Sequence, residues 1–189
     1  SGMKEVISTD ALVEDIHFKL STTTPEALGR KALSVSLSDI AAMGGDPKRV
    51  LVTLGLPERV SLLFLDKLYS GFNEICNQFK VELAGGDTVS SPQCFFINVA
   101  VIGEAKRVFT RKGAKPGDLI FVTGTLGDSS LGLKLIGKKK KGGKDNKFLI
   151  NRHLDPTPRV KEAGILARSK LDITSMIDIS DGLVQDLYH

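Results

Sequence analysis

At residues 81–88 the sequence reads Val81-Glu82-Leu83-Ala84-Gly85-Gly86-Asp87-Thr88, an apolar segment that ends in two glycines, a carboxylate and a hydroxyl. Because glycine has no Cβ, such a backbone can approach a bulky anion closely. A carboxylate repels phosphate, but it can hold a divalent cation, and Mg²⁺ prefers one or two carboxylates together with phosphate oxygens. The stretch therefore predicts a nucleotide–metal site.

Three other stretches place an acid beside a hydroxyl at the end of an apolar segment: Ser8-Thr9-Asp10, Leu37-Ser38-Asp39 and Asp178-Ile179-Ser180-Asp181-Gly182. For any single aspartate a helix cap or a turn is the simpler interpretation, whereas the repetition favours a shared site. Carboxylates gathered in one place repel one another unless cations neutralise them. We therefore predict that the four stretches converge on one site with several Mg²⁺ ions, which supply Lewis acidity for phosphoryl transfer.

Composition limits the classes of protein that the chain can represent. Its 189 residues, 41% of them hydrophobic, allow one large domain or two small ones with a real core. The sequence has no apolar run long enough for a membrane helix and no signal peptide, so we expect a cytoplasmic protein with no membrane partner. Cys76 and Cys94 are predicted to be free thiols, and zinc-ligand spacings are absent.

The net charge of +4 does not indicate nucleic-acid binding, because the excess is local. Seven lysines lie between Lys134 and Lys147, a segment that we interpret as a solvated loop. Aromatic residues do not alternate with basic ones as they do in many nucleic-acid-binding surfaces.

The first half predicts an α+β layer in the order β-α-β-α-β-β. Strands are expected over residues 5–9, 49–56, 81–84 and 95–102, with Gly85 to Thr88 as a turn and residues 11–18 as an irregular or helical connection. Thr24-Pro25-Glu26 predicts the start of a helix that ends at Gly44-Gly45, since a hydroxyl precedes proline and an acid. Ser61 predicts the cap of a second long helix.

A domain boundary is expected near residue 112, dividing an N-terminal domain (1–112) from a partial C-terminal α/β domain (113–189). There we predict strands over 118–123 and 173–179, and helices after Gly127, over 158–168 and after Gly182. The stretch Gly124-Thr125-Leu126-Gly127 resembles a phosphate loop but lacks the P-loop lysine. Because the chain ends just after a helix begins, we expect it to be a portion of a longer protein.

Taken in order, these motifs resemble those of the thiamine-monophosphate kinases. The matching stretches are Ser8-Thr9-Asp10 with His17-Phe18, Leu37-Ser38-Asp39, Gly85-Gly86-Asp87-Thr88, Val122-Thr123-Gly124-Thr125-Leu126-Gly127 and Ile177 to Gly182. Aminoimidazole-ribonucleotide synthetase, selenophosphate synthetase and a hydrogenase-maturation protein share the architecture. Among these related enzymes, the stretch from Thr9 to Phe18 resembles the thiamine-monophosphate kinases in particular.

The resemblance implies ATP-dependent phosphorylation of thiamine monophosphate to thiamine diphosphate by a homodimer that pairs through its N-terminal domains. It implies catalytic roles for Asp87 and Arg111 and a substrate contact for His17. The implied ATP contacts are Tyr69, Gly86, Asp87, Arg111 and Ser180. The implied Mg²⁺ ligands are Ser8, Thr9, Asp10, Asp39, Asp87, Asp178 and Asp181.

Three departures from the family pattern are present, and the first two bear on activity. A Gly-Asp-Asp segment upstream of the first strand and the C-terminal substrate segment are not in this sequence, and Asp15 stands where the family usually has glycine. Two alternatives therefore stay open: another ATP-using enzyme of the superfamily, and a non-catalytic module for nucleotide binding or dimerisation.

Overall fold

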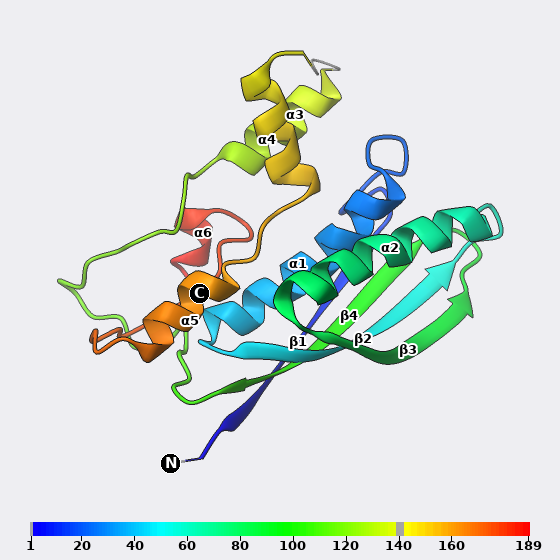
Figure 1. Cartoon of the computed structure of the whole chain (residues 1–189). Coiled ribbons are helices and arrows are strands. Elements are labelled where there is room, and N and C mark those ends of the chain that lie inside the picture. The colour runs from blue at the N-terminus through cyan, green and yellow to red at the C-terminus, as the bar shows by residue number, and fades with distance from the viewer. Residues whose placement is uncertain (1, 139–141) are drawn as a thin grey trace.

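The computed structural model describes residues 2–138 and 142–189. Its N-terminal half is a four-stranded sheet with two long helices packed along one face (Figure 1). The elements are β1 (Lys4–Val13), α1 (Pro25–Ala42), β2 (Asp46–Leu56), α2 (Leu62–Phe79), β3 (Glu82–Ser90) and β4 (Phe96–Ala105). The α+β class and the order of the first six elements are confirmed.

The strands lie in the order β1-β4-β2-β3, so β1 and β3 are the two edges. β4 pairs antiparallel with β1 and β2, whereas β2 and β3 are parallel and α2 forms the crossover between them. Asp10 lies opposite Val99, Val99 opposite Val52, and Val52 beside Gly86. Asp10 and Gly86 thus stand in one row, about 14 Å apart at the usual spacing of strands.

The core lies between the sheet and the two helices. Val50, Val52 and Leu54 alternate into it and are at most 2% exposed, whereas Leu51 on the other face is 40% exposed. The helices approach each other closely, because a Cβ on Gly71 of α2 would lie 2.9 Å from the carbonyl carbon of Glu26 in α1. One face of the sheet is therefore covered tightly and the other is left open.

Both predicted helix caps are present. The Thr24 hydroxyl accepts the Ala27 N–H at 3.2 Å, and the Ser61 hydroxyl accepts the Phe64 N–H at 3.2 Å. Each such cap stabilises a helix by about 1 kcal/mol. α1 ends just before Gly44, whose φ of 72° lies in the left-handed region.

Two local predictions in this half are wrong. Residues 11–13 continue β1, because β4 offers them partners as far as Phe96. Gly85 to Thr88 do not form a turn, because they lie inside β3 and pair with β2. A parallel partner 34 residues earlier in the sequence leaves no local signal, whereas two adjacent glycines are typical of a turn.

The second half contains α3 (Asp128–Gly137), α4 (Lys144–Leu154), α5 (Val160–Arg168) and α6 (Leu183–Asp186). The predicted strands over 118–123 and 173–179 are not formed, because neither segment finds a strand to pair with in the described part of the chain. Thr174 does donate to Asp118 at 2.8 Å. Leu119 and Phe121 are 80% and 84% exposed. The segment 134–147, predicted as a solvated lysine loop, is helical at both ends, because α3 extends to Gly137 and α4 begins at Lys144; residues 139–141 lie outside the described residues.

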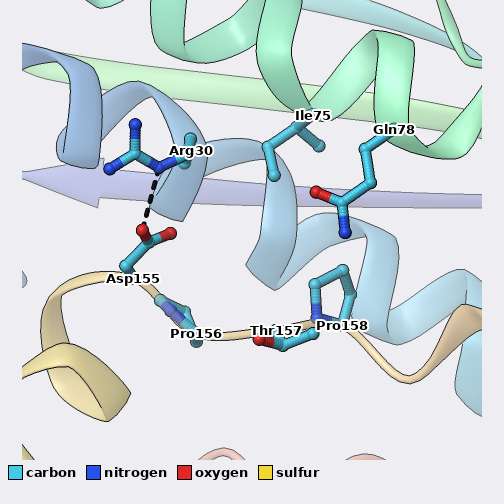
Figure 2. Close-up of a pocket in the computed structure, with 7 residues that line it drawn as sticks. All are labelled: Arg30, Ile75, Gln78, Asp155, Pro156, Thr157 and Pro158. Carbon is cyan, nitrogen blue, oxygen red and sulfur yellow. Dashed lines mark hydrogen bonds and ion pairs between the residues drawn. The ribbon is translucent and has the colours of Figure 1, made fainter. Parts of the chain in front are cut away.

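An ion pair joins the second half to the helices of the first (Figure 2). Arg30 of α1 donates to Asp155 at 2.9 Å and to Glu74 of α2 at 2.9 Å. Arg30 and Asp155 border a cavity of about 180 Å³ that is also lined by the segment Pro156 to Pro158. This contact fixes the chain that leads from α4 to α5 against α1.

Candidate functional site

The predicted site residues form two groups within one chain. The first is a shallow cavity of about 410 Å³ at the β3 edge, here called the edge pocket. Its lining residues are Val52, Tyr69, Leu83, Ala84, Gly85, Gly86, Asp87 and Thr88. Three of the residues expected to contact ATP, namely Tyr69, Gly86 and Asp87, are thus brought together although they come from α2 and β3.

Gly86 shapes the floor of the edge pocket. Its φ is 153°, and a Cβ at this position would lie 2.6 Å from the carbonyl carbon of Val52 and nearer still to the oxygen. A larger residue would therefore push β3 away from β2. Asp87 follows directly, and its carboxylate accepts the Thr88 N–H at 2.8 Å. The exposed backbone and the carboxylate together offer a bulky anion close approach and a cation ligand.

The second group, here called the carboxylate group, consists of Asp10 of β1, Asp39 of α1 and Asp178. Ser8 and Asp10 share the helix-covered face of β1 with the buried Val6, and the Ser8 hydroxyl donates to Asp39. Asp39 lies near the C-terminal end of α1, where the helix dipole disfavours a negative charge. Three separate elements thus bring carboxylates together.

Burial and the neighbouring negative charges both raise pKa values in the carboxylate group. Burial raises the pKa of Asp39 to about 6, the Ser8 hydrogen bond opposes that rise, and the charges of Asp10 and Asp178 add to it. Burial also raises the pKa of Asp178, with further contributions from Asp186, Asp10 and Asp181. No lysine or arginine among the described residues forms an ion pair with Asp10, Asp39 or Asp178. The group therefore carries uncompensated negative charge.

The donor chemistry of both groups fits Mg²⁺. Within residues 2–138 and 142–189, no three acidic, histidine or cysteine side chains lie close enough to enclose one ion. Mg²⁺ commonly uses only one or two carboxylates and completes its octahedron with water and phosphate oxygens. Asp10, Asp39 and Asp178 could hold ions in this manner beside a bound phosphate.

Two predicted metal ligands lie apart from the carboxylate group. Thr9 is exposed and donates to Asn98 at 3.3 Å, since its neighbours Ser8 and Asp10 point to the opposite face of β1. Asp87 stands on the far edge strand, in register with Thr53. The four acidic stretches, expected to converge, are therefore divided between the two edges of the sheet in a single chain.

The turn that carries His17 is tightly fixed. The Glu14 carboxylate accepts the Phe95 N–H at 2.9 Å and pairs with Arg59. Asp15 has a φ of 64°, and the Nδ1 atom of His17 accepts the Val13 N–H at 3.0 Å. The neutral imidazole therefore carries its proton on Nε2, which is left as a donor.

Arg111 lies on the segment that connects the two halves. Its backbone carbonyl accepts from the Ser175 hydroxyl at 2.9 Å. Its guanidinium has no ion pair with a described residue, and it is not among the residues that line the edge pocket. The phosphate-clamping role expected of Arg111 stays a prediction.

Two structural acids, Glu14 and Asp186, are not among the predicted site residues. Glu14 joins the His17 turn to the start of β4, and Asp186 accepts backbone N–H groups of the loop that contains Ser180 and Asp181. The signal for Asp186 was present, because it stands four residues after Gly182 at a predicted helix start. No comparable local signal exists for Glu14, whose partners are 45 and 81 residues away.

Comparison with known proteins identifies related chains. The family model for AIR synthase related protein, N-terminal domain, matches residues 1–105. Thiamine-monophosphate kinase of Bacillus subtilis is 39% identical over 98% of this chain and 58% of the relative, and that of Escherichia coli is 41% identical over 97% and 55%. A solved structure, AaThiL complexed with AMPPCP and TMP, is 40% identical with a TM-score of 0.90, covering 97% of this chain and 58% of that one.

The chain thus spans between half and two thirds of the length of these relatives. No helix in the described part of the chain combines the length and the apolar character that crossing a bilayer requires.

Proposed function

The chain belongs to the family of AIR synthase related proteins, and on that basis we propose that it acts in an ATP-dependent kinase that converts thiamine monophosphate to thiamine diphosphate. The alignments to the similar chains named thiamine-monophosphate kinase cover 97–98% of the length of this chain. The solved relative holds AMPPCP and TMP, an arrangement that supports the same two ligands for this chain.

The observation that carries the proposal is the carboxylate group. Three acids from β1, α1 and the 178–182 loop interact without a compensating cation among the described residues, and the pKa of Asp39 rises to about 6. Such an arrangement costs folding free energy, so it needs a reason. Divalent cations that bind a polyphosphate supply that reason.

The proposed Mg²⁺ ligands are Ser8, Thr9, Asp10, Asp39, Asp87, Asp178 and Asp181. Bound Mg²⁺ would neutralise charge on the transferred phosphoryl group and hold the phosphate oxygens in position. The proposed ATP contacts are Tyr69, Gly86, Asp87, Arg111 and Ser180. Tyr69 offers a ring already held edge-on against Phe72, with centroids 5.2 Å apart. Gly86 offers backbone that a phosphate can approach without meeting a Cβ.

The acceptor in this reaction is already a phosphate anion, so no general base has to remove a proton from it. The difficulty lies in bringing two polyanions together, and positioning with charge neutralisation addresses it. We assign the Nε2–H of His17 as a donor to thiamine monophosphate, because its Nδ1 is occupied by the Val13 amide. Asp87 and Arg111 are the proposed catalytic residues.

We also propose that two copies pair through the uncovered face of the N-terminal sheet, with a domain boundary near residue 112. Ile7 and Leu51 lie on this face and are 59% and 40% exposed. Apolar side chains gathered on an open sheet face favour burial against a second sheet. The cytoplasm is the proposed location, since Cys76 and Cys94 are both free.

The deciding experiment measures thiamine diphosphate formation from Mg-ATP, with thiamine monophosphate and thiamine offered separately to the full-length protein. We expect product from the monophosphate alone. Binding of Mg-ADP with no product from either compound would refute the kinase. It would favour a sister enzyme of the superfamily or a non-catalytic nucleotide-binding module.

A further inference from the structure

Asp186 is a buried acid that has no part in the proposed chemistry. It lies in α6 and is 4% exposed. Its Oδ2 accepts the N–H groups of Ser180 at 3.0 Å and Gly182 at 3.1 Å, and its Oδ1 accepts that of Asp181 at 3.4 Å. One carboxylate thus receives three consecutive backbone donors.

This arrangement explains how a charged group is tolerated inside the protein. Burying a carboxylate costs free energy unless hydrogen bonds replace its water, and bonds from backbone N–H to an ionised acid are among the strong ones. The φ of 117° at Gly182 allows the loop to curl so that the three N–H groups point to one place. Asp186 therefore holds loop 178–182 through the backbone N–H groups of residues 180–182.

The same loop carries three residues of the proposed site. Asp178 and Asp181 are proposed Mg²⁺ ligands, and Ser180 is a proposed ATP contact. Because the amides of residues 180–182 are held, this part of the loop has few backbone conformations left, so the positions of Ser180 and Asp181 are fixed before any ligand binds, and Asp178 lies two residues before the held segment. Groups that orient metal ligands in this way commonly change metal affinity 10–100-fold when they are removed.

We propose that Asp186 is a positioning residue that preorganises loop 178–182 for the Mg²⁺–nucleotide site without touching the ion. The inference rests on the proposed function. It differs from a purely electrostatic role, in which the negative charge of Asp186 would attract the cation from a distance. The two roles can be separated, because Asp186→Asn and Asp186→Ala both remove the charge but only asparagine keeps an oxygen acceptor.

The geometry predicts a graded result. The carbonyl oxygen of asparagine can occupy the Oδ2 position and keep the bonds from Ser180 and Gly182, whereas its NH2 group then faces the Asp181 N–H, so the 3.4 Å contact is replaced by two facing donors. Asp186→Ala loses all three hydrogen bonds. We therefore expect Mn²⁺·ADP, used as the probe, to bind Asp186→Ala about 10–100-fold more weakly than wild type. For Asp186→Asn we expect a loss of about threefold.

The assay titrates Mn²⁺ with ADP into the full-length protein and measures free Mn²⁺ by electron paramagnetic resonance. Asp172→Asn is the matched control, since it removes an exposed aspartate from the same half of the chain and should bind like wild type. A second measurement needs no variant: in the metal-free wild type, the amide of Gly182 should exchange with solvent much more slowly than an open loop amide.

Several outcomes would overturn the inference. Equal affinity in wild type and Asp186→Ala would show that the loop needs no anchor, and equal losses in both variants would assign the effect to charge. Exchange of the Gly182 amide at the open-loop rate would show that the loop is not preformed, even if Asp186→Ala fails to fold. None of these outcomes contradicts the proposed kinase function, which the thiamine diphosphate assay tests separately. A wild type that binds no Mn²⁺·ADP would refute the proposed function as well.

Discussion

Gly85 and Gly86 offer a direct test of the edge pocket, because they are neighbours with nearly the same backbone conformation. Their φ angles are 156° and 153°, so alanine at either position carries a similar conformational cost of about 1 kcal/mol. They differ in what a Cβ would meet. At Gly85 the nearest atom is Leu51 Cδ2 at 3.7 Å, which is ordinary contact, whereas at Gly86 three backbone atoms of Val52 lie within 2.8 Å.

The size of the difference follows from the β2–β3 ladder. Real Cβ atoms essentially never come closer than 3.0 Å to such neighbours, so Gly86→Ala forces β3 away from β2. A displacement of this size weakens two or three backbone hydrogen bonds, each with a net value of about 0.5–1.5 kcal/mol. We expect Gly86→Ala to be less stable than Gly85→Ala by about 1–3 kcal/mol.

The assay is urea unfolding followed by circular dichroism, with Mg-ADP affinity measured on the same samples. Gly86→Ala should unfold at lower urea and bind nucleotide more weakly than Gly85→Ala, which serves as the matched control. If the two variants unfold at the same urea concentration, Gly86 does not lie against Val52 and the reasoning is refuted.

Three further predictions concern single positions. Asp87→Asn should lose ATP turnover and keep its urea midpoint; unchanged turnover would remove Asp87 from the catalytic residues. Asp15→Gly should stabilise the protein by up to about 1 kcal/mol in thermal melts, because the φ of 64° suits glycine; a lower melting temperature would contradict this. Burial, with a smaller contribution from Lys31, lowers the pKa of His153 to about 4, so the fold prefers the neutral ring. The contribution of neutral His153 to the free energy of unfolding should be fully present above pH 6.5 and should fall by up to about 2 kcal/mol towards pH 4, allowing for partial solvent screening. His153→Gln should flatten this part of the curve of unfolding free energy against pH. An unchanged curve would refute the assignment.

Local signals predicted the helices well and the distant pairings poorly. Thr24 and Ser61 stand beside the amides they cap, so short-range chemistry decides those helix starts. The strand character of Gly85 to Thr88 depends instead on β2, which the sequence does not mark as its partner. The apolar segment 118–123 reads as a strand for the same local reasons, yet finds no ladder among the described residues.

For the site as well, local motifs are predicted from the sequence, whereas the distances between them depend on the whole fold. The motifs marked Asp10, Asp39 and Asp178, and the structure brings these three together because β1, α1 and loop 178–182 meet. It leaves Asp87 at the other edge, since sheet order is a property of the whole domain. For Asp186 the sequence offers one local signal, its place four residues after Gly182, but that signal does not specify which backbone N–H groups the carboxylate accepts.

The open edges of the sheet have a consequence for solubility. An edge strand presents unpaired N–H and C=O groups that invite another strand to add to it, and charged side chains oppose such addition. β1 carries Glu5 and Asp10, and β3 carries Glu82 and Asp87. We therefore expect the acids that we assign to cation binding to oppose such strand addition as well. Neutralising Asp10 and Asp87 together should promote strand-mediated aggregation, so light scattering belongs beside every activity measurement on such variants.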